Sequence, residues 1–164
     1  MALTKLATNY VDYNFWVAQK FTKWLSTKPD ELLDKEIPSS FSTILKTIKH
    51  IWDTEVYWYS ILAEKPIAND GQKNENLSTS QIMNGWLESS KRLSDLIHSF
   101  SEKDLMKSVK IESPWFQCEL PKYEYLIQVI NHGTYHRGQI VTIGRNVGIT
   151  DATNTDYNFY NVMK

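Results

Sequence analysis

The chain has 164 residues, of which 41% are hydrophobic and 23% charged, enough for one folded domain with a real core and too apolar for a disordered chain. Eighteen Lys and Arg residues against 19 Asp and Glu give a formal net charge of −1, without the basic field of a nucleic-acid-binding protein. The single cysteine, Cys118, excludes an internal disulfide and a cysteine-rich zinc site. No apolar run approaches the roughly 20 residues of a membrane span and no signal peptide is recognisable, so we expect a cytoplasmic protein.

The spacing of the apolar residues predicts long helices with few breaks. Residues 3–25 place apolar side chains at steps of three and four, which is typical of a helix with one buried face. The members of that face are Leu6, Tyr10, Tyr13, Val17, Phe21 and Trp24. A second helix is predicted from about Pro38-Ser39-Ser40, where a serine can cap the free N–H groups, to about Glu64. Its apolar side comprises Phe41, Ile44, Ile48, Ile51, Trp58 and Leu62.

The middle of the chain is more varied. Residues 65–78 are polar and are predicted to be a loop. A third helix is predicted from the serine and threonine caps at 78–80 to about Phe100. Residues 107–120 alternate polar and apolar side chains around Pro114, which is typical of a short β-hairpin or an extended excursion.

A fourth helix is predicted from Pro121, which suits a first helical turn, to about Asn146. The aromatic side chains of the tail, residues 149–164, are expected to pack back on the helices. We therefore predict an all-α fold, a four-helix bundle in a single domain over residues 1–164, with a short β-hairpin or extended excursion before the last helix. The long middle excursion implies a crossover connection that is not a tight turn.

A pair of histidines in the fourth predicted helix gives the strongest chemical signal. His132 and His136 are four residues apart, so on a helix their side chains lie one above the other and can share one metal ion. At about 100° per residue both fall within the apolar stripe, where an unpaired polar group costs about 1–3 kcal/mol. Two alternatives stay open at this point: the two side chains are hydrogen-bonded core histidines, or they face solvent at one end of the bundle.

A catalytic metal site usually has three protein ligands and an open position, so a third ligand is needed. His98 lies off the apolar stripe of its helix and is expected at the surface. His50 lies at the edge of a buried arc, so its phase permits a contact with another helix without requiring it. Glu55 lies inside that arc, and we interpret it as a buried carboxylate paired with an arginine or a backbone donor. Cys118 is interpreted as a packing residue.

Several segments together carry a family resemblance that covers nearly all of the chain. They are YNFW at residues 13–16, SFSTILKTIKHIWDTEVYW at 40–58, and HGTYHRGQI at 132–140 followed by Arg145, Gly148 and Thr155-Asp156-Tyr157. In this order and spacing they resemble the DinB superfamily, which includes bacillithiol- and mycothiol-dependent transferases and isomerases.

The resemblance implies a four-helix bundle with an unusual connection and a divalent metal ion held by three histidines, which map onto His50, His132 and His136. We expect Zn²⁺ or Ni²⁺, with Fe²⁺ and Mn²⁺ as alternatives, because imidazole suits all of these ions. Tyr57 shares a helix face with His50, and Gln139 shares one with His132. Both are therefore candidate catalytic residues that orient a ligand or a substrate.

The expected function is that of a divalent-metal-dependent enzyme acting on a small-molecule substrate. Thiol S-transfer with a low-molecular-weight thiol fits the resemblance best, and metal-assisted hydrolysis comes next. The alternative from another class is a non-catalytic binding or scaffold module, in which the ion holds the second helix to the fourth. A bundle without metal, its histidines buried and hydrogen-bonded, is the third interpretation. The resemblance also implies a homodimer, and the composition implies no nucleic-acid or membrane partner.

Overall fold

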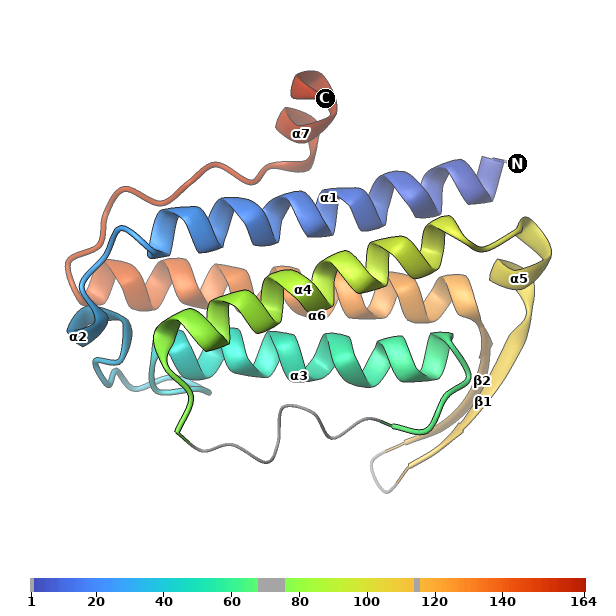
Figure 1. The fold of residues 1–164 in the computed structure, drawn as a ribbon, viewed down its shortest axis with the longest axis horizontal. Coiled ribbons are helices and arrows are strands. Elements are labelled where there is room, and N and C mark those ends of the chain that lie inside the picture. The colour runs from blue at the N-terminus through green and yellow to red at the C-terminus, as the bar shows by residue number, and fades with distance from the viewer. Residues whose placement is uncertain (1, 68–75, 114–115) are drawn as a thin grey trace.

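A computed structural model describes residues 2–67, 76–113 and 116–164. Its four long helices are α1 (Ala2–Leu25), α3 (Ile44–Leu62), α4 (Thr79–His98) and α6 (Lys122–Asn146) (Figure 1). The short elements are α2 (Asp30–Leu33), α5 (Glu102–Met106), α7 (Tyr157–Met163) and an antiparallel hairpin of β1 (Ser108–Glu112) and β2 (Gln117–Pro121). The predicted helical bundle with a hairpin before the last long helix is confirmed. None of the helices in the described ranges combines the length and apolar character needed to cross a bilayer.

The long helices are not joined in a simple up-and-down order. Both α1 and α3 pack against α4 and α6, so α1 and α3 lie diagonally opposite each other. Figure 1 shows α3 and α4 running in the same direction, opposite to α1 and α6. α3 ends at the hairpin end of the bundle and α4 begins at the opposite end, so a connection that is not a tight turn is present, as predicted. It joins α3 to α4 and not, as the excursion at 107–120 implied, α4 to α6. The loop predicted between α3 and α4 contains residues 68–75, which lie outside the described residues, as does Pro114.

Three details of the predicted elements were wrong. α3 begins later than predicted because Thr43 supplies the cap, its side chain accepting a hydrogen bond from Lys46 N at 3.0 Å, so Phe41 precedes the helix. Pro121 ends β2 and directly precedes α6 instead of lying in its first turn. Leu6 is 58% exposed, because it borders an open apolar groove between α1 and α6.

The tail packs on the bundle as predicted. Asp156 caps α7 by accepting hydrogen bonds from the backbone N–H groups of residues 158 and 159. The Tyr157 ring lies edge-on to Tyr13 at 5.0 Å between centroids, and Tyr160 lies 5.3 Å from Trp16. These contacts hold α7 against α1 (Figure 1).

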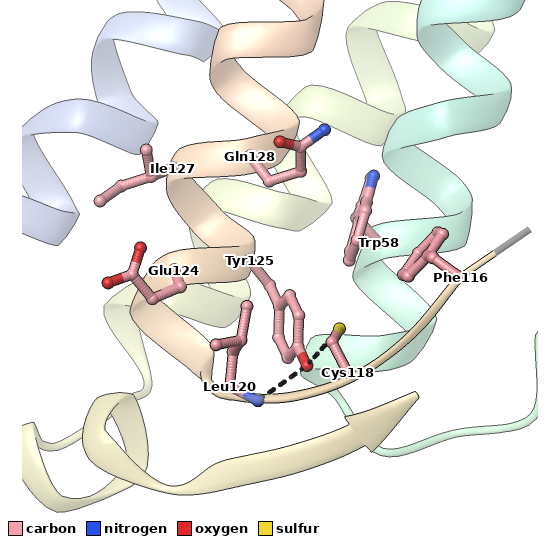
Figure 2. Close-up of a pocket in the computed structure, with 8 residues that line it drawn as sticks. All are labelled: Trp58, Phe116, Cys118, Leu120, Glu124, Tyr125, Ile127 and Gln128. Atoms are coloured by element: carbon pink, nitrogen blue, oxygen red, sulfur yellow. Dashed lines mark hydrogen bonds between the residues drawn. The ribbon is translucent and has the colours of Figure 1, made fainter. Parts of the chain in front are cut away.

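The hairpin is fastened to α6 by one buried tyrosine. The Tyr125 hydroxyl donates a hydrogen bond to Val109 O at 2.7 Å and accepts one from Leu120 N at 3.0 Å, so it contacts both strands. Figure 2 shows the hydroxyl at the level of β2, beside the Cys118 sulfur. Burial is the first cause that raises the pKa of Tyr125, to about 12, so the phenol keeps its proton. The position of the hairpin against α3 and α6 is therefore fixed.

The buried apolar side chains form two clusters along the bundle. One contains Phe21 and Trp86 and lies toward the end where α1 leads to α3. The other contains Trp58 and Ile130 and lies toward the hairpin. Gly85 allows α4 to approach α3 closely, because a Cβ at this position would collide with the Trp52 ring.

A layer of polar side chains separates the two clusters, one from each long helix. Its members are Asn14, Glu55, Ser90 and Arg137, each no more than 4% exposed. Asn14 Nδ2 donates to Glu55 Oε1 at 2.7 Å, and Asn14 Oδ1 accepts from Arg137 Nη1 at 3.1 Å. Ser90 Oγ donates to Glu55 Oε2 at 2.7 Å, and Arg137 Nη2 donates to Thr134 Oγ1 at 2.7 Å. The carboxylate and the guanidinium are thus linked through Asn14.

Glu55 is buried as predicted, and the asparagine mediates its pairing with arginine. Burial raises the pKa of Glu55, while the hydrogen bonds from Asn14 and Ser90 and the charge of Arg137 oppose that rise. A buried charged pair is tolerated only when both partners keep their hydrogen bonds.

We expect Asn14→Ala to lower the free energy of unfolding by about 2–6 kcal/mol, because it removes a hydrogen-bond partner from two buried groups at about 1–3 kcal/mol each. Urea denaturation measures this change. Gln19→Ala is the matched control, since Gln19 is exposed on the same helix and should change stability by less than about 0.5 kcal/mol. Equal stability of the two variants would contradict a stabilising role for the polar layer.

Candidate metal centre

α3 presents His50 to α6. Ile48 and Ile51 of α3 are buried in the core, which leaves His50 half-buried at the border of that face. The His50 ring centroid lies 5.0 Å from that of His132 and 4.5 Å from that of His136. The contact of His50 with another helix, which its position in the sequence permitted without requiring, is therefore present.

The two histidines of α6 complete a triangle of imidazoles. Their ring centroids are 4.4 Å apart; His136 is 5% exposed and His132 is half-buried. One ring nitrogen of each of the three histidines lies within 4.8 Å of the other two. In the part of the chain that the structure describes, no carboxylate or thiol joins this group. His50 on α3 thus meets two histidines of α6, of which the nearer in sequence, His132, is 82 positions away.

The spacing of the His50 and His132 nitrogens fits one divalent ion. Two imidazole nitrogens that bind one zinc ion at about 2.0–2.1 Å lie about 2.9–3.4 Å apart for bond angles of about 90–109°. His50 Nε2 and His132 Nε2 are 2.9 Å apart. This distance also suits a direct N–H···N hydrogen bond, so the metal-bound and metal-free interpretations differ in where the protons lie and not in where the rings lie. The three histidines can form a metal site.

Burial keeps the three rings uncharged at neutral pH. Loss of water, with smaller contributions from the neighbouring His136 and His132, lowers the pKa of His50 to about 4. Burial also lowers the pKa of His132 and of His136. Since a metal binds the lone pair of a neutral imidazole, the site offers the required form of each side chain at pH 7.

Gln139 determines which nitrogen of His136 carries the proton. Gln139 Oε1 lies 2.7 Å from His136 Nδ1, and Gln139 Nε2 donates to Ser40 Oγ at 3.4 Å. Because an amide oxygen only accepts, Nδ1 must hold the proton, which leaves the Nε2 lone pair free. Gln139 therefore contacts His136 and not His132, whose helix face it was predicted to share.

Phe41, which the sequence placed on a helix, covers the site. Its ring stacks on His50 at 4.2 Å and lies edge-on to His136 at 5.5 Å. The residue belongs to the segment between α2 and α3, because the helix predicted to start at about Pro38-Ser39-Ser40 begins only at Ile44. Phe41 excludes water from one side of His50, which is the condition that lowers the pKa of this ring.

The other candidate residues lie elsewhere. Tyr57 is two turns beyond His50 along α3, and its ring packs edge-on against Trp58 at 5.3 Å. Thr54, one turn beyond His50, has its Oγ1 3.5 Å from His132 Nε2 and was not singled out from the sequence. His98 is exposed as predicted and lies 2.8 Å from Asp12 Oδ1.

Comparison with known proteins gives one consistent result. The model of the DinB family matches residues 2–164. Protein DinB of Bacillus subtilis is 27% identical over 175 residues, which cover 98% of this chain and 96% of that protein. The crystal structure of a DinB-like protein from Bacillus cereus superposes with a TM-score of 0.71 at 21% identity, covering 88% of this chain and 94% of the other. A DinB-like protein of B. subtilis gives 0.61 at 13% identity, covering 95% and 99%. The chain therefore belongs to the DinB family.

Proposed function

We propose that this chain is a divalent-metal-dependent enzyme whose ion is held by His50, His132 and His136. The convergence of three uncharged imidazoles from α3 and α6, with no fourth ligand among the described residues, is the observation that carries the proposal. Three protein ligands leave positions open for exchangeable ligands. A divalent ion at this point supplies a Lewis acid that lowers the pKa of a thiol or water beside it.

Thiol S-transfer is the reaction class we propose first, with metal-assisted hydrolysis second. In S-transfer, the sulfur of a low-molecular-weight thiolate forms a bond to an electrophilic atom of the substrate, and the leaving group departs with its electron pair. This chain's own residues set the conditions: Gln139 keeps the His136 proton on Nδ1, and Phe41 keeps water from one side of His50. The choice of Zn²⁺ or Ni²⁺ over Fe²⁺ or Mn²⁺ is part of the proposal.

The homodimer implied by the family resemblance stays a prediction. The apolar groove between α1 and α6 supports it, because Leu6 and Ile127 line that groove and are 58% and 38% exposed. Apolar side chains that are exposed together are typical of an interaction surface.

Elemental analysis of untagged protein purified without chelator should find about one divalent ion per chain. His50→Ala, His132→Ala and His136→Ala should each lose it, because two imidazoles remain. His98→Ala is the matched control, since His98 is exposed and pairs with Asp12 away from the site, and this variant should keep its metal. Stoichiometric metal in His50→Ala would refute the three-histidine assignment.

Replacing Gln139 tests its role as the partner of His136. We expect Gln139→Leu to bind metal about 10- to 100-fold more weakly, because the proton on Nδ1 loses its acceptor. Gln139→Glu keeps an acceptor at the same place and should retain most of the affinity. Competition with a chromophoric chelator measures both constants. An unchanged affinity in Gln139→Leu would contradict a positioning role.

The protein loaded with Co²⁺ separates an enzyme from a scaffold. At an open site, 2-mercaptoethanol should shift the visible cobalt spectrum, and the zinc form should then accelerate transfer of this thiol to 1-chloro-2,4-dinitrobenzene. The His136→Ala variant, treated identically, is the control. A cobalt spectrum that no thiol or small anion changes would favour the metal-stabilised scaffold.

A further inference from the structure

We propose that the open cavity between α3, α6 and β2 holds a planar aromatic part of the substrate, uncharged or positively charged. The assignment rests on the proposed function of the histidine centre, because it treats the cavity and the centre as two parts of one site. Neither the family resemblance nor the metal proposal requires this cavity.

The cavity has a volume of about 360 Å³. It is lined by Trp58, Phe116, Cys118, Leu120, Glu124, Tyr125, Ile127 and Gln128 (Figure 2). Cys118 and Leu120 are two residues apart on β2 and therefore face the same side. Phe116, which directly precedes β2, lines the same cavity. One wall is thus the hairpin, which Tyr125 fixes in place through its bonds to Val109 and Leu120. A volume of this size suits a small ligand.

The cavity lies one helical turn from the histidines, along the same two helices. Gln128 is one turn before His132 on α6, and Trp58 is one turn after Thr54 on α3. Thr54 Oγ1 is 3.5 Å from His132 Nε2, so Thr54 lies at the level of the imidazoles. One turn of helix rises about 5.4 Å, a distance that a ligand with one two-ring group and a reactive end can span.

The lining favours a flat, apolar group. Trp58 stacks with Tyr125 at 5.5 Å and 26° between the ring planes, and with Phe116 at 6.2 Å and 23°. Phe116 remains 39% exposed, so its ring is available to a ligand. Aromatic contacts of this kind contribute about 0.5–1.5 kcal/mol beyond the buried area.

The charge of the cavity selects against anions. Among its described lining residues, Glu124 is the charged side chain, and neither lysine nor arginine lines the cavity. Two unit charges about 4 Å apart interact by about 1 kcal/mol even in water. A carboxylate or phosphate on the ligand is therefore disfavoured, while an ammonium group is favoured.

Three naphthalene probes of one shape test the proposal: 1-naphthylmethylamine, which is a cation at pH 7, neutral naphthalene-1-methanol, and anionic 1-naphthoate. We expect the cation to bind about 10-fold more tightly than the anion, with the neutral probe between them. Two-dimensional ¹H–¹⁵N NMR titrations of metal-loaded and metal-free protein give the dissociation constants and should place the shifted amides at residues 116–128. Equal affinities, or shifts confined to other elements, would overturn the proposal.

Two variants with matched controls separate the contribution of the Phe116 ring from that of the Glu124 charge. Phe116→Ala should weaken all three probes about 2- to 10-fold, whereas Phe159→Ala, which removes a similarly exposed ring on α7, should leave them unchanged. Glu124→Gln should reduce the preference for the cation about 2- to 5-fold. Glu119→Gln makes the same charge change on the other face of β2 and should not alter that preference.

The outcomes separate this proposal from the function of the metal centre. Failure of the probes to bind a protein that holds one metal ion per chain overturns the subsite and leaves the metal centre intact. If elemental analysis finds that the chain does not bind metal, probe binding at residues 116–128 shows an aromatic cavity only. The assignment of that cavity to an enzyme's substrate is then overturned. Probe binding that coincides with a change in sedimentation, and is lost in a monomeric state, would assign the cavity to a contact between two copies and overturn the proposal.

Discussion

A buried guanidinium determines where α6 can lie in this bundle. Arg137 is 4% exposed, and a charge removed from water is tolerated only when it is paired. Its hydrogen bonds reach Asn14 on α1 and Thr134 one turn earlier on α6. Gly133 contributes to the fit, because a Cβ at this position would lie 2.8 Å from Arg137 Nη1. Thr134 and Gly133 move with Arg137, but Asn14 belongs to α1, so a slide or rotation of α6 would break the bond between the guanidinium and Asn14. The polar layer therefore fixes both the height and the rotation of α6 in the bundle.

The histidine centre takes its position from the same layer. His136 directly precedes Arg137, and Thr54 directly precedes Glu55, so neighbouring side chains on each helix point about 100° apart. One member of each pair enters the core, and the other faces the junction of α3 and α6. The core network therefore orients the imidazoles without touching them, and Gln139 and Phe41 complete the arrangement from outside the core.

The sequence was most informative where a pattern repeats along one helix. Apolar spacing predicted the long helices, and the four-residue interval predicted that His132 and His136 lie together. A single position such as His50 has no such pattern: its phase placed it at a border, and only the packing of α3 on α6 decided which way it faces. The position of Phe41 outside the helix could not be predicted, because several adjacent serine and threonine residues can cap a helix. Since Thr43 is the cap, the residues before it do not belong to α3. The cavity also depends on how the hairpin folds back, which alternation along a strand does not specify.

The separation of His50 and His132 by 82 positions has a consequence for how the site forms during synthesis and folding. Closing so long a loop is entropically costly and contributes nothing until the distant segments meet. During synthesis, the three histidines can meet only after α6 has emerged and docked. Loading of the proposed ion would thus require the assembled bundle, and a truncated chain that lacks α6 would not bind it.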